Sequence, residues 1–403
     1  MWKTVTLGDV CDFQNGFAFK SSLFKENGKP ILRISNIQNE EIDTRKTVYF
    51  DAKDYDTDFS RYEVKPDDLL IAMSGATTGK IGFNKTDTTY YLNQRVGNLK
   101  PKPTLDKVFL YYLLSTKVQE NLSISKGAAQ PNLSSEQIKN ISFSLPPLAE
   151  QQRIVAKLDA AFAEIDGVIG QTEKKIHHAK LLMQRTIDES IKGESSDMLK
   201  VKLDEFCDIK HGFAFDGKSF SVSDDESKPI VLTPGNFAEN GTTKFNDKNT
   251  KRLQIEYDKK LLFSTDDLVI VMTDLSSKML LLGKPAFVKQ SNILHNQRIG
   301  LVKNSEQIIV NDYLYFYFRT TNYLNEIKKT ASGTMVRHTA PKRILRNTIT
   351  APKSLSEQRA ISTKITMSLS KSENLIDIYK TKVSNLLSLK SAILAQELQS
   401  EAA

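Results

Sequence analysis

Two long amphipathic stretches stand out in the pattern of apolar and polar positions along this chain of 403 residues. The first follows Pro146-Pro147, and its apolar or small residues recur at steps of three and four: Ile154, Leu158, Ala161, Ile165, Val168, Thr172, Ile176, Ala179, Met183 and Ile187. This spacing predicts a helix over residues 149–192, because the prolines exclude helix before it and Glu150 suits the positive end of a helix dipole. Such a helix is roughly 60 Å long, so its apolar face needs a second long helix to cover it.

The second stretch supplies that helix. It begins with Leu355-Ser356-Glu357-Gln358-Arg359, which resembles Leu148-Ala149-Glu150-Gln151-Gln152-Arg153, and it predicts a helix over residues 356–400 with an apolar face formed by Ile361, Ile365, Leu369, Ile376, Tyr379, Val383, Leu386 and Ile393. We predict that the two helices pack as an antiparallel coiled coil. One such helix would more simply be a solvated coiled coil, but two copies at corresponding places favour the pair.

The segments that precede the two helices are copies of each other. Val5–Asp12 and Gly16–Phe19 return 196 positions later as Val201–Asp208 and Gly212–Phe215. Further matches follow in the same order: Asp67–Met73 with Asp266–Met272, and Asn93–Gly97 with Asn296–Gly300. The chain is therefore a tandem duplication, with predicted boundaries at residues 1–148 (first globular domain), 149–192 (first helix), 193–198 (linker), 199–355 (second globular domain) and 356–400 (second helix).

Each globular domain is expected to be α+β. Leu69–Met73 and Leu268–Met272 are continuous apolar runs, which predict buried central strands. The runs that begin at Phe109 and Tyr313 predict helices, with Thr104 and Asn311 as plausible caps. We expect a curved, mostly antiparallel sheet in each domain, and an approximate two-fold relation between the two copies.

Composition and charge narrow the functional classes. The chain is 39% hydrophobic and 26% charged, which is ordinary for a globular protein, and it shows neither a membrane span nor a signal peptide, so we expect a cytoplasmic protein. Cys11 and Cys207 occupy equivalent places in the repeat and predict two core residues rather than a disulfide. The helices carry +2 of the net charge of +8, so most of the positive charge lies in the globular domains, as nucleic-acid binding would require.

No catalytic motif is complete. Ser74–Lys80 resembles a phosphate-binding loop, but it lacks the first glycine and the hydroxyl residue after the lysine. The only Pro-Pro pair is flanked by leucines, which excludes the tetrad of an adenine methyltransferase. Pro66-Asp67 lacks the partner residues of a nuclease site, and the His177-His178 pair falls on the polar face of the first helix.

The chain combines a Leu-Gly-Asp-like start, a Gly-Phe-Ala-Phe turn, an Asp-Asp-Leu-Leu-Ile strand and the helix start Leu-Pro-Pro-Leu-Ala-Glu-Gln-Gln-Arg-Ile, and a second, similar set follows in the second copy. In duplicate, this pattern resembles the specificity subunit of a type I restriction-modification system. The resemblance covers nearly the whole chain, and the Pro-Pro-Leu-x-Glu-Gln pattern is its most specific part. The second copy departs from the pattern by having the single proline Pro352.

The resemblance implies two target-recognition domains held apart by antiparallel helices, each domain recognising half of a bipartite sequence in double-stranded DNA. It also implies that the helices dock two methyltransferase subunits, that restriction and translocase subunits join outside, and that this chain is not catalytic. S-adenosylmethionine, ATP and magnesium would then belong to the partner subunits, with no cofactor or metal bound here.

Base edges and phosphates are contacted by Arg, Lys, Asn, Gln, Ser and Thr on loops. In the first domain the candidates are Arg33, Ser35, Asn36, Ser74, Thr77, Thr78, Lys80, Gln94, Arg95, Lys126 and Gln130. In the second they are Thr233, Asn236, Ser276, Ser277, Lys278, Gln297, Arg298, Thr334, Arg337 and His338. Each loop could instead be an ordinary polar turn, and the shared Asn-Gln-Arg could be a structural bracket or a phosphate contact.

Loops that differ between the copies are better predictors of base specificity. Gln130 in the first domain stands near the position of Val336 and Arg337 in the second, so the two domains should prefer different half-sites. The main alternative is a tandem coiled-coil scaffold that binds proteins rather than DNA, and a self-sufficient enzyme is a third possibility. The absence of an export signal and the charge on the globular domains favour the DNA-binding interpretation.

Overall fold

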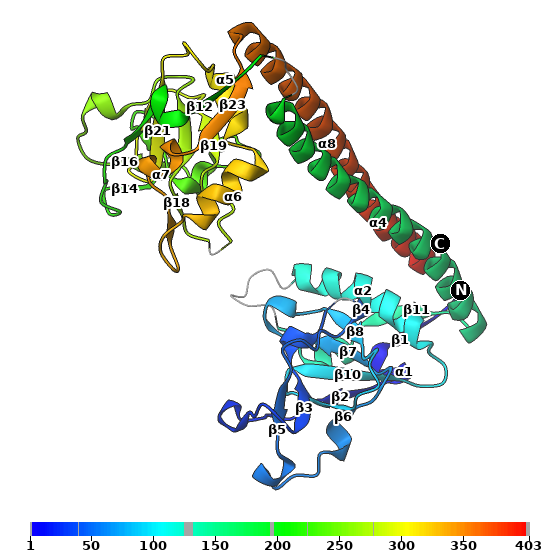
Figure 1. Cartoon of the computed structure of the whole chain (residues 1–403). Coiled ribbons are helices and arrows are strands. Elements are labelled where there is room, and N and C mark those ends of the chain that lie inside the picture. The colour runs from blue at the N-terminus through cyan, green and yellow to red at the C-terminus, as the bar shows by residue number, and fades with distance from the viewer. Residues whose placement is uncertain are drawn as a thin grey trace. The chain divides into compact units, whose positions relative to one another are not determined.

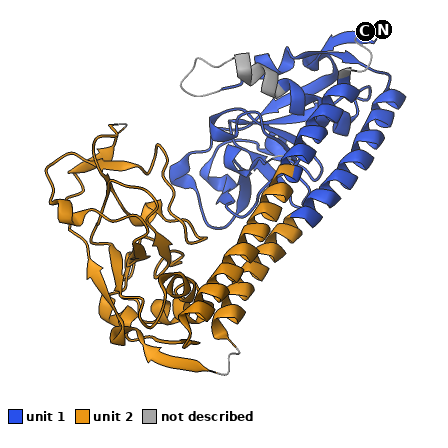
Figure 2. Cartoon of the chain, turned by 90° about the horizontal axis from the view of Figure 1, so that it is seen from above, with its two compact units in different colours: residues 1–172, 382–403 blue, residues 173–381 orange. Residues whose placement is uncertain are grey.

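A computed structural model describes residues 2–38, 40–124, 132–193, 197–223, 225–276 and 278–399 of the chain. The chain forms two compact units: residues 1–172 with 382–403, here called unit 1, and residues 173–381, here called unit 2 (Figure 2). Each unit contains one copy of the sequence repeat and one end of each long helix. The fold is α+β, with tandem domains and a pair of long helices, as predicted (Figure 1).

Unit 1 contains a five-stranded sheet, a four-stranded sheet and a two-stranded ribbon. The five-stranded sheet has the order β2 (Cys11–Asn15), β10 (Val96–Pro101), β7 (Leu69–Ala72), β8 (Ile81–Phe83) and β4 (Glu40–Glu41). The four-stranded sheet has the order β5 (Val48–Phe50), β3 (Lys29–Leu32), β9 (Tyr90–Leu92) and β6 (Glu63–Val64), and the ribbon pairs β1 (Lys3–Thr6) with β11 (Ser142–Leu145). The pairs are antiparallel except β4 with β8 and β3 with β9, which confirms the mostly antiparallel prediction.

Strand β7 lies in the middle of its sheet and is buried on both faces. Leu69 and Ile71 face the helices, where Phe109 lies in the same hydrophobic cluster. Leu70 and Ala72 belong to the cluster on the opposite face of the strand. Alternate residues of a strand point to opposite faces, so two buried faces explain the continuous apolar run.

Three helices complete the globular part of unit 1: α1 (Leu7–Val10), α2 (Lys107–Ile124) and α3 (Ser135–Lys139). The predicted cap of α2 at Thr104 is wrong. The carboxylate of Asp106 accepts hydrogen bonds from the amides of Val108 and Phe109 at 2.9 and 2.8 Å, so Asp106 caps the helix. Aspartate is among the best N-caps because its oxygen satisfies amides that have no partner within the helix.

Unit 2 repeats this plan. One sheet has the order β13 (Cys207–His211), β21 (Ile299–Asn304), β17 (Leu268–Val271) and β19 (Pro285–Phe287). A second sheet has the order β14 (Phe220–Val222), β16 (Lys251–Leu253), β15 (Ile230–Val231) and β20 (Ile293–Leu294). Two ribbons pair β12 (Met198–Lys202) with β23 (Thr348–Pro352), and β18 (Thr273–Asp274) with β22 (Arg337–His338). Strand β17 is fully buried, as predicted.

The helices of unit 2 are α5 (Asn311–Tyr317), α6 (Thr321–Lys329) and α7 (Pro341–Leu345). Asn311 is the first helical residue of α5 rather than its cap, and Val310 holds the cap position. The amide of Val310 donates instead to the side-chain oxygen of Gln358 at 2.9 Å. A residue distant in sequence therefore satisfies the start of this helix, which local sequence rules could not predict.

The long helices are α4 (Leu148–Lys192) and α8 (Leu355–Gln399), whose starts lie one residue before the predicted ones. In unit 1, Lys157 pairs with Glu397 at 2.7 Å and Asp166 pairs with Lys390 at 2.8 Å. Numbers rise along α4 as they fall along α8, so the helices are antiparallel, as predicted. Every residue of the two predicted apolar stripes is buried or half-buried. Among the described residues, no helix is both long and apolar enough to cross a bilayer.

Gln151 and Gln358 explain why the Glu-Gln pattern marks the start of each long helix. Both side chains are fully buried. Gln151 accepts a hydrogen bond from the Asp106 amide at 2.7 Å and donates to the carbonyls of Thr104 and Pro146 at 2.9 and 2.8 Å. Gln358 makes the same three bonds, with Val310, Ile308 and Pro352. Each glutamine therefore fastens a long helix to the loop before α2 or α5.

The two cysteines lie in the core, as predicted. Cys11 and Cys207 are buried and free. Burial raises the pKa of each thiol to about 12, because the charged thiolate would lose its hydration. Both residues therefore act as small apolar core residues.

Candidate nucleic-acid interface

The Asn-Gln-Arg turn presents an exposed glutamine and arginine in each unit. Gln94 and Arg95 lie between β9 and β10, and Gln297 and Arg298 lie between β20 and β21, all four exposed. The turn backbone is held in the same way in both copies, because the Arg95 carbonyl accepts from the Met73 amide at 3.0 Å and the Arg298 carbonyl accepts from the Met272 amide at 2.9 Å. The turn is thus a backbone element, fixed in the same way in both units, that presents two exposed polar side chains.

The Gly-Phe-Ala-Phe motif packs against this turn. Phe17 forms a β-bridge with Asn93, and Phe213 forms one with Asn296. A Cβ atom on Gly16 would lie 2.1 Å from the carbonyl oxygen of Asn93, which no side chain could tolerate. The glycine is therefore required for close approach of two backbones, and the two repeated motifs build one local structure.

In unit 1 the loop that begins at Ser74 meets the Asn-Gln-Arg turn. Ser74 is buried, and its hydroxyl accepts a hydrogen bond from Nη1 of Arg95 at 3.2 Å. Thr77 and Lys80 are half-buried and Thr78 is buried. The hydroxyl of Thr77 donates to the carbonyl of Ile34 at 2.9 Å, and Nζ of Lys80 donates to Oε1 of Gln38 at 2.8 Å.

These contacts bring the Ser74 loop together with the short 3-10 helix Ile34–Asn36. Ser35 is exposed there, whereas Asn36 is buried and uses its amide inside the loop, accepting from the Arg33 amide at 2.9 Å and donating to the Asp43 carbonyl at 2.8 Å. The half-buried Arg33 donates to the Lys46 carbonyl at 3.2 Å. The structure therefore gathers most unit 1 candidates into one surface, while Lys126 and Gln130 lie outside the described residues.

Unit 2 has a corresponding Asn loop. Asn236 is fully buried, and its side-chain oxygen accepts from the amide and the hydroxyl of Thr233 at 2.9 and 2.8 Å. Its amide nitrogen donates to the Asn249 carbonyl at 3.0 Å. Asn36 and Asn236 thus fix equivalent loops from within, and both side chains are buried rather than presented to a ligand.

The second cluster of unit 2 candidates surrounds the β18–β22 ribbon. Thr273 pairs with His338, and their side chains approach to 3.0 Å. The buried Asp274 accepts from the amides of Ser276 and Leu281, both at 2.7 Å, and so shapes the loop that exposes Lys278. Ser277 lies outside the described residues.

The tip of the facing loop contains the remaining unit 2 candidates. Thr334 and His338 are exposed, and the half-buried Arg337 donates from Nη1 to the Gly333 carbonyl at 2.6 Å. Its neighbour Met335 is 82% exposed. The tip is thus a basic and apolar projection at the end of a hydrogen-bonded ribbon.

One residue that sequence reasoning missed is Lys284. It follows Gly283 as Lys80 follows Gly79, and both glycines have positive φ, at 82° and 83°. The amide of Gly283 bonds to the Val271 carbonyl as that of Gly79 bonds to the Ala72 carbonyl, at 2.8 Å in each case. Lys284, rather than Lys278, is therefore the structural counterpart of Lys80. The repeated Gly-Lys pair was the available signal, and the longer loop around Asp274 obscured it.

This surface offers positive charge and hydrogen-bond donors. Among the described residues, no group of three His, Cys, Asp or Glu side chains could hold a metal ion. Exposed arginine, lysine, glutamine and hydroxyl groups on rigid turns are suited to phosphates and base edges. Lys284 donates to the Glu239 carbonyl at 2.9 Å, and burial lowers its pKa.

Comparison with known proteins gives a consistent picture. The sequence matches the family described as "Type I restriction modification DNA specificity domain" over residues 1–177 and 195–386. It is 28% identical over 214 residues to the specificity subunit of the type I restriction enzyme EcoBI of Escherichia coli, covering 51% of this chain and 43% of that protein. It is 35% identical over 164 residues to the MjaVIII specificity subunit of Methanocaldococcus jannaschii, covering 39% and 38%. The matched stretches span less than half of these relatives.

Solved structures share the fold. One, from a study of complex assembly and conformational transition of the type I R-M system, has a TM-score of 0.75 at 17% identity and covers 98% of this chain and 97% of that chain. The HsdS subunit of Thermoanaerobacter tengcongensis has a TM-score of 0.53 at 18% identity, with 99% and 96% covered. At these sequence identities the structural similarity shows a shared fold.

Proposed function

We propose, from the premise that this chain belongs to the family of type I restriction modification DNA specificity domains, that it is the DNA-binding specificity subunit of such a system. Each unit recognises one half of a bipartite, asymmetric target in double-stranded DNA. The observation that carries the proposal is the duplicated surface around Arg95 and Arg298, where one backbone scaffold supports different loops. The matches give no support to the alternative of a protein-binding scaffold.

The surface divides into two classes of residue under this proposal. Arg95 and Arg298 stand on the same scaffold in both units, so they contact phosphates, which every sequence provides. Base discrimination falls to exposed side chains on loops that differ: Ser35 in unit 1, and Lys278, Thr334 and His338 in unit 2. The buried Asn36, Ser74, Thr78 and Asn236 hold these loops in shape.

The long helices act as the docking site for two methyltransferase subunits. Support comes from apolar side chains on their outer faces, which the coiled coil leaves exposed: Leu181, Leu182, Met367, Leu375, Ile378, Leu387 and Leu389. Exposed apolar patches on helices are typical of protein-protein interfaces. Restriction and translocase subunits would join this core, and the complex would act on DNA in the cytoplasm.

The chain itself is proposed to be non-catalytic. S-adenosylmethionine, ATP and magnesium would be bound by the methyltransferase and translocase subunits. The division of labour within the chain follows the sequence repeat: target-recognition domains at residues 1–148 and 199–355, helices at 149–192 and 356–400, and a linker at 193–198.

Methylation mapping tests the proposal. We expect adenine methylation at one bipartite motif in DNA from cells that contain this chain and its methyltransferase subunit, and no such methylation after deletion of the chain. Exchanging unit 2 loop residues Lys278 and Thr334 should alter one block of the motif and leave the other unchanged. A methylation pattern that does not depend on this chain would refute the proposal.

A further inference from the structure

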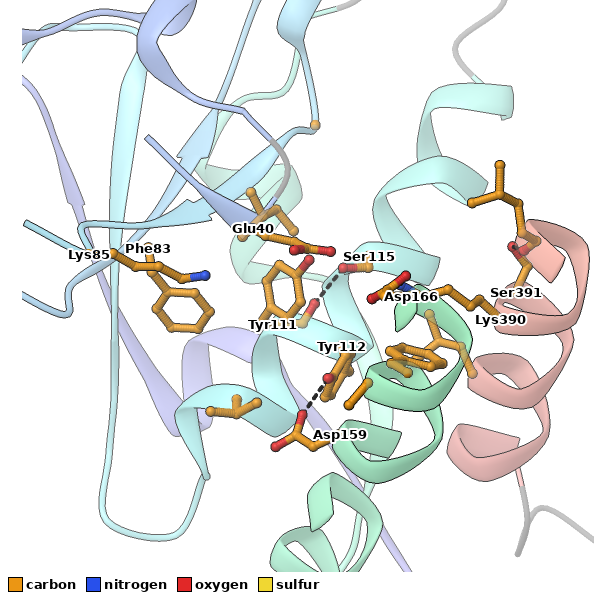
Figure 3. A pocket seen from close by; sticks show the side chains of 17 residues that line it. Glu40, Phe83, Lys85, Tyr111, Tyr112, Ser115, Asp159, Asp166, Lys390 and Ser391 are labelled. Atoms are coloured by element: carbon orange, nitrogen blue, oxygen red, sulfur yellow. Dashed lines mark hydrogen bonds and ion pairs between the residues drawn. The ribbon is translucent and has the colours of Figure 1, made fainter. Parts of the chain in front are cut away.

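A pocket of about 590 Å³ lies in unit 1 (Figure 3). It borders the surface proposed to bind DNA, because Gly79, between Thr78 and Lys80, is one of its lining residues. Strands β4 and β8, helix α2 and the unit 1 ends of both long helices supply its walls. The residues that define its chemistry are Glu40, Phe83, Tyr111, Tyr112, Ser115 and Asp159. It is therefore an aromatic pocket with carboxylates at its wall.

The aromatic wall is continuous. The ring of Tyr111 lies 5.4 Å from that of Phe83 and 5.3 Å from that of Tyr112, centroid to centroid. The hydroxyl of Tyr112 donates to Oδ1 of Asp159 at 2.5 Å, which fixes this carboxylate beside the rings (Figure 3). Burial raises the pKa of Tyr111 to about 12, and the negative charge of Glu40 adds to the shift. The phenol is thus neutral and faces an acidic neighbour.

The charges within the pocket favour a cation. Lys390 is already paired with Asp166, its Nζ lying 2.8 Å from both carboxylate oxygens and 4.7 Å from the centroid of the Phe162 ring. Among the described residues that line the pocket, this pairing leaves the carboxylates of Glu40 and Asp159 with the one remaining ammonium group, that of Lys85. Aromatic faces next to carboxylates attract cations, and planar ones best.

Unit 2 has an equivalent wall of aromatic rings. Its rings are Phe287, Tyr315 and Phe316, with centroids 5.1 and 5.0 Å apart in succession. The guanidinium of Arg319 lies 5.2 Å from the Tyr315 ring centroid and 5.6 Å from that of Phe316, and its Nη1 donates to the Tyr315 hydroxyl at 3.0 Å. In unit 2 an arginine of the chain therefore covers the aromatic wall.

Ser115 is the unit 1 residue at the position of Arg319. The next residue is a threonine in both copies. The hydroxyl of Thr116 donates to the Leu113 carbonyl and that of Thr320 to the Tyr317 carbonyl, both at 2.8 Å, which supports this alignment. Ser115 donates its hydroxyl back to the Tyr111 carbonyl at 2.8 Å and so leaves the ring faces uncovered. The unit 1 pocket is the site of Arg319 without the arginine.

We propose that the unit 1 pocket binds the guanidinium group of an arginine side chain from a protein partner. Protein is the source because the pocket is continuous with the exposed face of α8, where Leu387 lines the pocket and is 53% exposed. Only this choice of source rests on the proposed docking function of the long helices. The preference for guanidinium rests on the comparison of Ser115 with Arg319.

Ligand-observed NMR on the full chain tests the site without DNA or a partner. The probes are N-acetyl-arginine methylamide, its neutral citrulline analogue, the equivalent capped lysine, and free agmatine. We expect the capped arginine to bind at roughly millimolar Kd, from the usual affinity per atom of small ligands, and at least tenfold more tightly than capped citrulline. Equal binding of the citrulline analogue, or no binding of capped arginine, would overturn the proposal. Agmatine binding without capped arginine binding would overturn the protein source.

Two reciprocal variants complete the test. Ser115→Arg should cover the rings from within, weaken binding of capped arginine at least tenfold and raise the melting temperature, whereas Ser115→Met should block the probe without that rise. Arg319→Ser should lower the melting temperature of unit 2, with partial recovery in millimolar ethylguanidinium but not in ethylammonium. Failure of ethylguanidinium to restore Arg319→Ser would contradict the role assigned to the aromatic wall.

Discussion

Replacement of Gln151 by methionine should destabilise unit 1 and loosen the attachment of α4. Methionine matches the length of glutamine but forms none of its three hydrogen bonds. Thr104 is exposed, so its carbonyl can bond to water, whereas the amide of the half-buried Asp106 and the carbonyl of the buried Pro146 lose their partners where water has less access. At about 1 to 3 kcal/mol for each buried group left unsatisfied, the expected loss is about 3 kcal/mol.

The equivalent change in unit 2 should cost more. Gln358 serves the buried Val310 amide and the buried Pro352 carbonyl, together with the half-buried Ile308. Because no member of this set is freely rehydrated, we expect a loss of about 4 kcal/mol for Gln358→Met. Such losses are a large fraction of the 5 to 15 kcal/mol that stabilises typical domains.

Urea unfolding combined with hydrogen exchange measures both effects. Gln151→Met should speed amide exchange in α2 and the first turns of α4 while leaving unit 2 unchanged, and Gln358→Met should do the reverse. Gln152→Met is the matched control, because Gln152 is exposed and should change stability by less than about 0.5 kcal/mol. If Gln151→Met were as stable as Gln152→Met, the three hydrogen bonds of Gln151 would not anchor α4.

Three further predictions concern the DNA surface, the helices and pH. Arg95→Ala and Arg298→Ala should each weaken DNA binding across sequences and reduce the salt slope by about one unit, whereas a change of base preference at one half-site would assign the arginine to base contact. Ile378→Ser, with Leu182→Ser, should weaken assembly with methyltransferase subunits at least tenfold without altering DNA preference, as measured by sedimentation. Burial lowers the pKa of His295, so on acidification the unfolded chain takes up a proton that the folded chain does not. The stability of unit 2 should therefore fall as the pH falls below about 6.5. His295→Leu should make this stability less dependent on pH in urea titrations.

Patterns that repeat along the sequence predicted most of the fold. The spacing of Ile154, Leu158 and Ile165 follows the period of a helix, and these residues are buried in α4. The continuous run at Leu69 followed from burial on both faces of a central strand. Such signals are local because each depends on the geometry of a single element.

Contacts between distant segments could not be predicted in this way. The amide of Val310, at the cap position of α5, donates a hydrogen bond to the side-chain oxygen of Gln358, which lies 48 positions away. Asn36 and Asn236 lie in polar loops whose composition suggests exposed DNA-binding residues. Both are nevertheless buried, and each side chain donates a hydrogen bond to the backbone of a later loop residue. Polarity predicts that a residue needs a partner, whereas only the fold determines whether the partner is protein or ligand.

The duplication shows how one scaffold can support two different sets of loops. The carbonyls of Arg95 and Arg298 accept hydrogen bonds from the amides of Met73 and Met272, which directly follow the equivalent strands β7 and β17. The carbonyls of the same two methionines accept from the amides of Leu133 and Thr339, at 2.8 and 2.9 Å. A loop inserted between these fixed points can change in length and side chains without disturbing the sheet, as the longer loop around Asp274 illustrates. A residue that differs between the units at such a loop tip alters only what its own unit contacts. Under the proposed function, two unequal half-sites would follow from substitutions at the tips, while the shared turn would contact the DNA backbone in the same way in each unit.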